Sequence, residues 1–251
     1  MPILQARDLK QNHVLYDTQA VDRINARENG TEFSISDHIR GMVYSLLSCE
    51  TPWERIEPNL KEIDKVFYDY DPDYIKSQDP ALFTYEIKEL KCGNRNIKRQ
   101  MEALGDNVRV FERIEKEYGS LDEYINSHDP EEVILAFSDY ESEYKLKMMH
   151  ISLVCEYLRN VGVDLAKPDR HLCRFFGRDR MGKDSSESPA TIEDVFCRIE
   201  DLVEETGLLR VEIDNIIWSF CADGYGEICT AEPHCDRCPI RDMCKYNGVS
   251  V

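Results

Sequence analysis

Apolar residues recur at intervals of three and four along most of the chain, which is the period of an amphipathic helix. No alternating apolar and polar run is long enough to predict a strand. The strongest early stripe predicts a helix over 37–49, with Ser34 or Ser36 as its N-cap. A weaker stripe predicts a helix over 8–27, and Gly30 breaks the chain after it. We therefore expect an all-α protein.

Four dipeptides mark further helix starts, because each pairs an oxygen-bearing side chain with a following proline. The first residue can cap the helix, and proline fits the first helical position, where no backbone hydrogen bond is lost. The four pairs are Thr51-Pro52, Asp71-Pro72, Asp79-Pro80 and Asp129-Pro130.

Another apolar stripe predicts a helix over about 143–162, with Gly162 as the residue that ends it. The residue before a proline is extended, so Lys167-Pro168 places Asp169 at the N-cap of a new helix and His171 in its first turn. Aspartate is a good N-cap whatever its chemistry. From spacing alone, this carboxylate has a structural explanation as well as a catalytic one.

The C-terminal part continues the helical pattern. Thr191 to Asp194 predicts a capping box at a helix start. A later apolar face leads to a cysteine-rich segment, and its residues are Ile213, Ile216, Ile217 and Phe220.

The most specific chemistry in the chain is a set of four cysteines in sixteen residues, spaced C-x5-C-x2-C-x5-C: Cys229, Cys235, Cys238 and Cys244. A loop this short cannot gather four thiols by apolar packing, so we expect a bound group to hold them. Structural zinc usually takes two separate two-ligand knuckles, whereas here one C-x-x-C lies between two lone cysteines. We favour a [4Fe–4S] cluster over zinc, and disulfides or unmetallated thiols are the further alternatives.

Composition is that of an ordinary soluble protein, with 251 residues, of which 42% are apolar and 32% charged. This length allows one large core or two modest ones. No run approaches eighteen apolar residues and the first residues lack a signal-peptide pattern, so we expect a cytoplasmic protein without membrane contact. The remaining cysteines lie among apolar neighbours and are expected to be free thiols in the core: Cys49, Cys92, Cys155, Cys173, Cys197 and Cys221.

The net charge of −18 opposes nucleic-acid binding if it is spread evenly. It is not spread evenly, because segments 88–99 and 165–183 each carry a net charge of +4. A solvated helix face is the alternative explanation of either segment.

Taken together, three features resemble the helix-hairpin-helix DNA glycosylases of the endonuclease III kind. They are the apolar helix ending in Gly162, the sequence Asp169-x-His171 with Arg174 three residues beyond, and the C-terminal cysteine loop. The resemblance is carried mainly by 143–178 and 213–246, and more weakly by Leu46-Leu47-Ser48 with Thr51.

The resemblance implies an all-α, two-lobed fold with the active site in a cleft between the lobes. A six-helix lobe would cover about 35–145. A second lobe over 146–251 would hold the hairpin, the catalytic aspartate and the cluster, and residues 1–34 would pack on it.

The resemblance also implies roles for individual residues. An ionised Asp169 would stabilise the positive charge that develops on the deoxyribose, and would orient the attacking water. Cys229, Cys235, Cys238 and Cys244 would be the cluster ligands, and the cluster would be structural and would help position DNA. Arg237, Arg241 and Lys245 would present positive charge beside it.

The DNA contacts expected from the resemblance lie in the hairpin and after the aspartate: Lys145, Lys147, His150, Arg170 and Arg174. The target base must leave the stack to be reached, so an aromatic or apolar pocket is required. Its candidates are residues that otherwise belong to a core: Tyr44, Trp53, Phe175 and Trp218.

The sequence departs from the family pattern in the hairpin, which usually reads Gly-x-Gly so that backbone N–H groups can approach a phosphate. This chain has Lys147-Met148-Met149-His150 instead, and Ile151 stands where bifunctional members carry their Schiff-base lysine. The first cysteine gap is also one residue shorter than the common family loop.

These observations predict a monofunctional DNA N-glycosylase of base-excision repair, acting as a monomer on lesion-bearing double-stranded DNA. A bifunctional glycosylase/AP lyase with a displaced lysine is one alternative. A catalytically silent, cluster-bearing DNA-binding protein and a zinc-stabilised interaction protein that binds no DNA are the others. The sequence does not identify the excised base.

Overall fold

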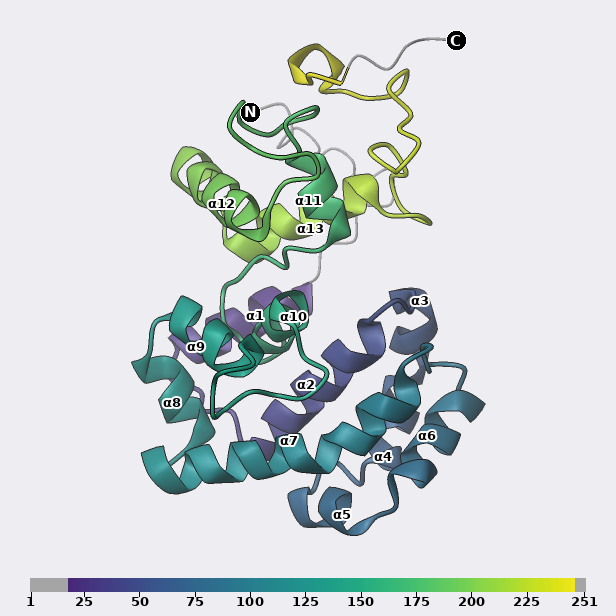
Figure 1. Ribbon diagram of the computed structural model, residues 1–251, viewed down its shortest axis with the longest axis vertical. Coiled ribbons are helices and arrows are strands. Elements are labelled where there is room, and N and C mark those ends of the chain that lie inside the picture. Colours follow the sequence, from purple (N-terminus) through teal and green to yellow (C-terminus); the bar gives the residue numbers. More distant parts are fainter. Residues whose placement is uncertain (1–17, 247–251) are drawn as a thin grey trace. The chain divides into compact units, whose positions relative to one another are not determined.

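The computed structural model describes residues 18–246, and every regular element in this range is a helix (Figure 1). The all-α prediction is confirmed. The α-helices are α1 Thr18–Glu28, α2 Ile35–Ser48, α3 Trp53–Ile56, α4 Leu60–Val66, α5 Pro72–Ser77, α6 Pro80–Glu89, α7 Ile97–Tyr118, α8 Leu121–Ser127, α9 Pro130–Ser138, α10 Ile151–Asn160, α11 Arg170–Phe175, α12 Ile192–Thr206 and α13 Arg210–Cys221. Short 3₁₀ helices cover Glu57–Asn59 and Arg241–Met243. No helix in the described range is both long and apolar enough to span a bilayer.

The chain divides into two compact units. The larger unit is Arg23–Val163, and the smaller unit contains, within the described range, residues 18–22 and 164–246. The division falls after α10, not before it as the resemblance implies, because α10 packs along α2. Gly41 permits this close approach, since a Cβ there would lie 3.1 Å from Cβ of Asn160. Of the N-terminal segment expected to pack on the cluster lobe, residues 1–17 lie outside the described range and residues 23–34 belong to the larger unit.

The N-caps predicted from the sequence are found in the structure, with one exception. Ser34 caps α2 in a reciprocal capping box with Asp37. The three aspartates that precede proline each accept a backbone N–H bond from the first turn: Asp71, Asp79 and Asp129. The prediction for Thr51-Pro52 is wrong, because Pro52 itself is the N-cap of α3 and has no side-chain acceptor to offer.

The prediction of a helix over 143–162 is correct only for its second half. α10 begins at Ile151, and a series of turns precedes it. Leu146 and Met149 are buried, as their place in the apolar stripe predicts, but they are buried from turns. The end of the helix is as predicted: Gly162 follows α10 with φ +81°, and a Cβ there would come within 2.5 Å of the carbonyl oxygen of Arg23.

A buried polar network joins four helices of the larger unit. The fully buried His38 of α2 contacts the Tyr157 hydroxyl of α10 through Nδ1 at 2.9 Å and Asp122 Oδ1 of α8 through Nε2 at 3.2 Å. Burial lowers the pKa of His38 despite the nearby carboxylate. Arg27 of α1 pairs with the same carboxylate. All the polar groups have partners, so the network fixes how these helices pack.

The core of the smaller unit lies between α11, α12 and α13. The apolar face predicted for α13 is buried, and the capping box of Thr191 with Asp194 starts α12 as predicted. Ile228 and Ile240 extend this core into the cysteine loop on either side of its C-x-x-C. Among the scattered cysteines, Cys197 is exposed and so differs from the prediction of core thiols.

Candidate functional site

Asp169 is the N-cap of α11, as its spacing predicts. Its Oδ1 accepts the backbone N–H of His171 at 2.7 Å and of Leu172 at 3.2 Å, and its Oδ2 lies 3.1 Å from His171 Nδ1. Burial acts to raise the pKa of Asp169, but the hydrogen bonds and charge of His171 outweigh it and hold that pKa below its ordinary value. The side chain keeps 15% of its surface exposed, so this site offers an ionised carboxylate that solvent can reach.

Two carboxylates that the sequence analysis missed hold the segment leading to Asp169. Asp164 accepts the backbone N–H groups of Arg210 and Val211 at the start of α13, at 3.1 and 3.0 Å. Asp214, one turn further along α13, accepts the Lys167 N–H at 2.8 Å. The approach to Asp169 is therefore fixed to α13 at two points. Nothing in the local sequence signals bonds across more than forty residues.

An aromatic ring of α13 lies against His171, the side chain that contacts Asp169. The ring of Trp218 meets that of His171 edge-on at 5.9 Å and that of Tyr225 at 4.8 Å, and Trp218 is only half-buried. Phe175, a second pocket candidate, is 1% exposed within the core of the smaller unit. Of these two candidates, only Trp218 keeps exposed ring surface, and it lies against His171 next to Asp169.

The other two pocket candidates belong to the larger unit and lie against each other. The rings of Tyr44 and Trp53 meet edge-on with their centroids 6.5 Å apart. The Tyr44 hydroxyl donates to Asp64 at 2.6 Å, and the hydroxyl of Tyr70 donates to the same oxygen at 2.8 Å. Burial, followed by these contacts with Asp64, raises the pKa of Tyr44. Trp53 is the more exposed of the two candidates.

The two arginines expected to contact DNA after Asp169 have different surroundings. Arg170, the first residue of α11, is exposed. Arg174 is half-buried and donates from Nε to the carbonyl oxygen of Cys229 at 3.1 Å. This link between α11 and the cysteine loop was not predicted from the sequence.

The turn before α10 carries the candidate hairpin residues Lys147 and His150. The ammonium of Lys147 pairs with Asp106 of α7 at 2.5 Å, while much of the side chain stays exposed. His150 is the exposed N-cap residue of α10 and makes no side-chain capping bond to the helix.

Lys145, the third hairpin candidate, is more enclosed. Its ammonium donates to the Met149 carbonyl oxygen and lies 4.8 Å from the ring centroid of Tyr140. Burial lowers the pKa of Lys145, although the charge of Asp139 acts against this. Its contacts hold it to the turn itself.

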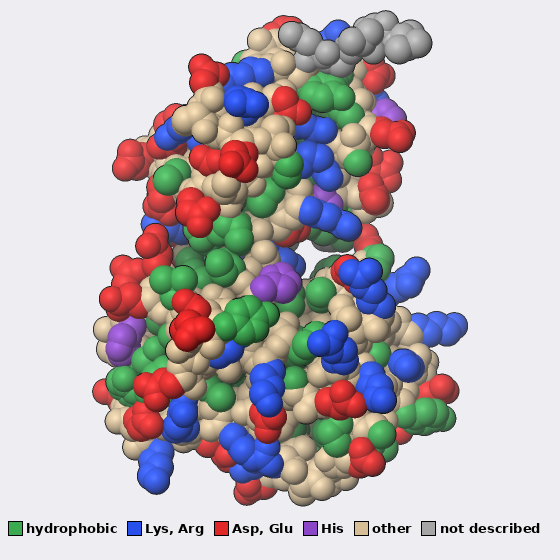
Figure 2. Space-filling model, viewed as in Figure 1, with side chains coloured by type: hydrophobic (Ala, Val, Ile, Leu, Met, Phe, Trp, Pro, Cys, Tyr) green, Lys and Arg blue, Asp and Glu red, His purple; other side chains and the backbone are tan. Residues whose placement is uncertain are grey.

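The predicted basic segment 88–99 lies at the surface of the larger unit. All of its cationic side chains are exposed: Lys88, Lys91, Arg95, Lys98 and Arg99. On the face drawn in Figure 2, Lys and Arg side chains gather around α3 and α6. Arg95 pairs with Glu50 at 2.7 Å, so part of this charge is neutralised within the protein.

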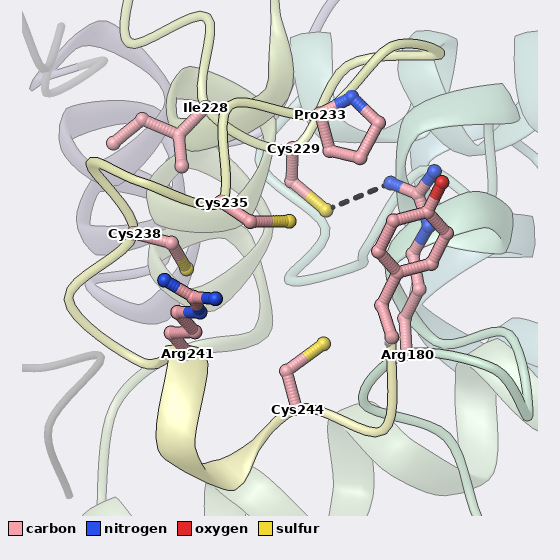
Figure 3. A pocket seen from close by; sticks show the side chains of 9 residues that line it. Arg180, Ile228, Cys229, Pro233, Cys235, Cys238, Arg241 and Cys244 are labelled. Carbon is pink, nitrogen blue, oxygen red and sulfur yellow. Dashed lines mark hydrogen bonds between the residues drawn. The ribbon is translucent and has the colours of Figure 1, made fainter. Parts of the chain in front are cut away.

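The four clustered cysteines line one pocket of about 330 Å³, part of it open to solvent. Their sulfur atoms face a common space in Figure 3. The other lining residues come from the same loop, from the segment after α11 and from the chain after the last cysteine: Arg180, Ile228, Pro233, Arg241 and Tyr246. All four thiols therefore line the same pocket, together with the buried Arg180.

Cys229 has the properties of a preformed thiolate. A hydrogen bond from the buried thiol of Cys221, together with the nearby Arg180, lowers the pKa of Cys229 to about 6 against the effect of burial. Burial raises the pKa of Cys238 and of Cys244, and the neighbouring cysteines add to this. A metal ion bound by these sulfurs would instead lower the pKa values of the thiols, because its positive charge favours their deprotonated form.

Arg180 supplies a buried positive charge beside these sulfurs. Its guanidinium is almost inaccessible and donates to Cys229 Sγ at 3.0 Å and to the Thr230 carbonyl at 3.1 Å. The Tyr246 ring lies 5.1 Å from it. A buried charge is costly unless it is compensated, and a thiolate-rich group in this pocket would compensate it. In the sequence Arg180 stands out only as part of a basic segment, because a sequence shows a charge but not the group that it contacts.

The donor set therefore fits a thiolate-bound metal group, although the sulfurs are not arranged as a closed ligand shell. Across residues 18–246, no group of three or more His, Cys, Asp or Glu side chains is placed to hold a metal ion. Lys245, expected to present charge beside the cluster, pairs with Asp184 at 2.5 Å. Arg237 donates to the Glu227 carbonyl at 3.3 Å.

No family model matches the sequence, and no curated protein matches it significantly. Solved structures do match. The structure of the Methanocaldococcus jannaschii 8-oxoguanine glycosylase/lyase with a 15mer DNA containing 8-oxoguanine superposes with a TM-score of 0.58 at 18% identity, over 87% of this chain and 95% of that one. The structure described as 8-oxoguanine DNA glycosylase (MjOgg) from the same organism gives 0.55 at 19% identity, over 87% and 92%.

The chain has the helix-hairpin-helix DNA glycosylase fold. The similarity extends over nearly the whole of the solved glycosylase chains, so it includes both compact units and not one lobe alone. The turn that the sequence resemblance assigns to the hairpin directly precedes α10, and Asp169 follows α10 as the N-cap of α11.

Proposed function

We propose that this protein is a DNA glycosylase that excises a damaged or mispaired base by hydrolysing its N-glycosidic bond. The observation that carries the proposal is Asp169, an ionised and partly exposed carboxylate at the N-cap of α11. The fold is shared with two solved 8-oxoguanine DNA glycosylases, which adds support.

Asp169 would act on the sugar. As the bond to the base breaks, positive charge develops on the deoxyribose, and a nearby carboxylate stabilises that charge. The same carboxylate can orient or deprotonate the water that attacks C1′. The N–H groups of His171 and Leu172 occupy Oδ1, so the carboxylate is held in one orientation. Trp218 contributes an aromatic surface beside it for a base that has left the stack.

Hydrolysis in a single step is the form of the reaction that the chain supports best. By the sequence resemblance Ile151 stands at the place of the Schiff-base lysine, and it is the first residue of α10. Lys147, the nearest replacement in the sequence, is paired with Asp106, and an amine must be neutral to attack C1′. We therefore infer a monofunctional enzyme that leaves an intact strand with an abasic site.

Double-stranded DNA is the partner that this activity requires. The hairpin would contact a phosphate through Lys147, His150 and the backbone, because the N–H groups of Met148 and Ile151 have no acceptor among the residues that the structure describes. Arg170 would add a phosphate contact after Asp169. Such concentrated contacts are needed in a chain whose net charge is −18.

We also propose that Cys229, Cys235, Cys238 and Cys244 hold a [4Fe–4S] cluster. Four thiols in one pocket, one of them a thiolate, and the buried charge of Arg180 support this assignment. Bound there, the group would crosslink the loop and stabilise it, since ligand loops of this length fold with their metal. Visible absorbance with iron and sulfide analysis separates a cluster from zinc.

The decisive experiment is a panel of duplexes, each with one defined lesion. The panel should contain 8-oxoguanine, alkylated bases and deaminated bases, because the excised base is not fixed by the residues described above. Release of at least one base by the wild-type protein, and none by Asp169→Asn, would support the proposal. DNA binding without release of any base would instead identify a catalytically silent DNA-binding protein.

A further inference from the structure

The turn over 145–150 adopts a conformation that its sequence does not favour. Met148 has φ +63°, in the left-handed region that glycine enters freely and other residues enter at a cost. No glycine lies in this turn. Contacts from elsewhere in the larger unit must therefore hold the backbone in place.

Asn107 on α7 makes those contacts. Its side chain is fully buried, and its amide forms hydrogen bonds with both the N–H and the carbonyl of Lys147. Oδ1 accepts the Lys147 N–H at 2.7 Å, and Nδ2 donates to the Lys147 carbonyl at 3.0 Å. This pair of bonds fixes the peptide units on either side of Lys147, and it satisfies the donor and the acceptor that a tight turn leaves open.

Further anchors set which side chains face solvent. Leu146 and Met149, on either side of Lys147 in the turn, are buried. Asp106, the residue before Asn107, pairs with the ammonium of Lys147. With Leu146 and Met149 directed inwards, Lys147 and His150 are exposed and Met148 is half-buried.

We propose that Asn107 is the positioning residue of the DNA-binding hairpin. The two hydrogen bonds from its amide to the Lys147 backbone, called the clamp below, maintain the turn without glycine. The turn then presents N–H groups and side chains to a phosphate. Asn107 itself does not touch DNA, because its amide is buried and both of its polar atoms are occupied. This inference rests on the proposed function, since it assumes that the turn binds a DNA phosphate.

The test measures the affinity of the full-length protein for a lesion-bearing duplex by fluorescence anisotropy at several salt concentrations. Asn107→Ala should weaken binding about tenfold or more. It should also reduce the slope of log affinity against log salt by about one, the amount expected for one lost phosphate contact. A side chain that only stabilised the fold would not change the salt slope at temperatures well below the melting transition.

Asn160→Ala is the matched control. Asn160 also bonds a backbone carbonyl within the larger unit, that of Gly41 at 3.1 Å, but it lies at the other end of α10. Its replacement should lower the melting temperature and leave the salt slope unchanged. An equal loss of slope in both variants would overturn the assignment to Asn107.

A second substitution tests whether the left-handed conformation of Met148 is what makes the hydrogen bonds from Asn107 necessary. Glycine accepts the left-handed conformation without the clamp, so Met148→Gly should restore at least part of the affinity lost in Asn107→Ala. If Asn107→Ala does not fold, Asn107→Asp replaces it, because a carboxylate keeps the acceptor for the Lys147 N–H and removes the donor to its carbonyl.

The possible outcomes distinguish a failure of the positioning role of Asn107 from a failure of the proposed function. Duplex binding by the wild type that survives unchanged in the Asn107 variants would overturn the positioning role and leave the proposed function intact. A wild-type protein that binds no duplex at any salt concentration would overturn the proposed function and this inference with it.

Discussion

Replacing Asp169 by asparagine should separate the catalytic role of this side chain from its role in the fold. The carboxylate caps α11 through Oδ1, and asparagine offers a similar oxygen to the N–H groups of His171 and Leu172. The charge, in contrast, is lost completely. The expected result is a protein that folds and binds DNA but does not release the base.

The magnitudes make this separation measurable. Asparagine and aspartate are about equally good N-caps, so the capping loss should be a few tenths of a kcal/mol. The contact with His171, between side chains that are 13% and 15% exposed, loses its charge and adds about 1.5 kcal/mol. Removing a group that stabilises transition-state charge costs about 2.7–4 kcal/mol, or roughly 10²–10³ in rate. The effect on the rate therefore exceeds the effect on stability.

Single-turnover base release on whichever lesion duplex the wild type cleaves is the appropriate assay, combined with a melting curve and a binding isotherm. Asp194→Asn is the matched control, since it makes the same change at the N-terminus of α12 in the same unit. The control should lose some stability and keep its rate. A rate for Asp169→Asn within threefold of wild type would refute the catalytic assignment.

Three further predictions concern the cofactor, the number of steps and pH. Cys238→Ala should lose bound iron and melt at a lower temperature, whereas a variant that is colourless but melts like wild type would show that the loop folds without the cluster. Borohydride should trap no protein–DNA adduct, and an adduct that disappears in Lys147→Ala would establish a lyase instead. The pKa of Asp169 is lower in the folded state, so its stabilising effect is complete above about pH 4 and is lost as pH falls below that value. Melting curves of wild type and Asp169→Asn should therefore differ above about pH 4 and converge in stronger acid.

The features that sequence predicted well depend on interactions within a few residues. Capping requires an oxygen and an N–H two or three positions apart, so Ser34, Thr191 and Asp169 were identifiable as N-caps. Gly162 was identifiable because many helices end at a residue with positive φ, which glycine adopts most easily. Both signals are local, and neither requires knowledge of the fold.

Apolar periodicity was less reliable before α10. Leu146 and Met149 continue the stripe of the helix, yet they belong to a turn. A stripe records which side chains are buried, and a turn packed against a core buries its side chains as well as a helix does. The error in the predicted helix start follows from that ambiguity.

The distribution of charged residues along the sequence did not predict which groups the individual arginines contact. Arg174 and Arg180 belong to one basic segment, which the resemblance associates with DNA contacts. In the structure they donate to the carbonyl and to the sulfur of Cys229, respectively. More than forty residues separate each arginine from that cysteine, so only the fold could reveal the contact. Two of the positive charges that follow Asp169 in sequence are therefore hydrogen-bonded to the cysteine loop.

The hairpin shows why a missing motif does not imply a missing structure. Glycines in a hairpin motif specify a backbone conformation, and any residue can adopt that conformation if other contacts offset its cost. Here Met148 takes the positive φ, and the buried Asn107 fixes the adjacent peptides from forty residues away in sequence. A search for Gly-x-Gly would reject this turn, whereas a search for the clamp would find it. The clamp also makes a different prediction from the glycine motif: a chain that holds its hairpin through one side chain should lose DNA affinity through a single substitution on another helix.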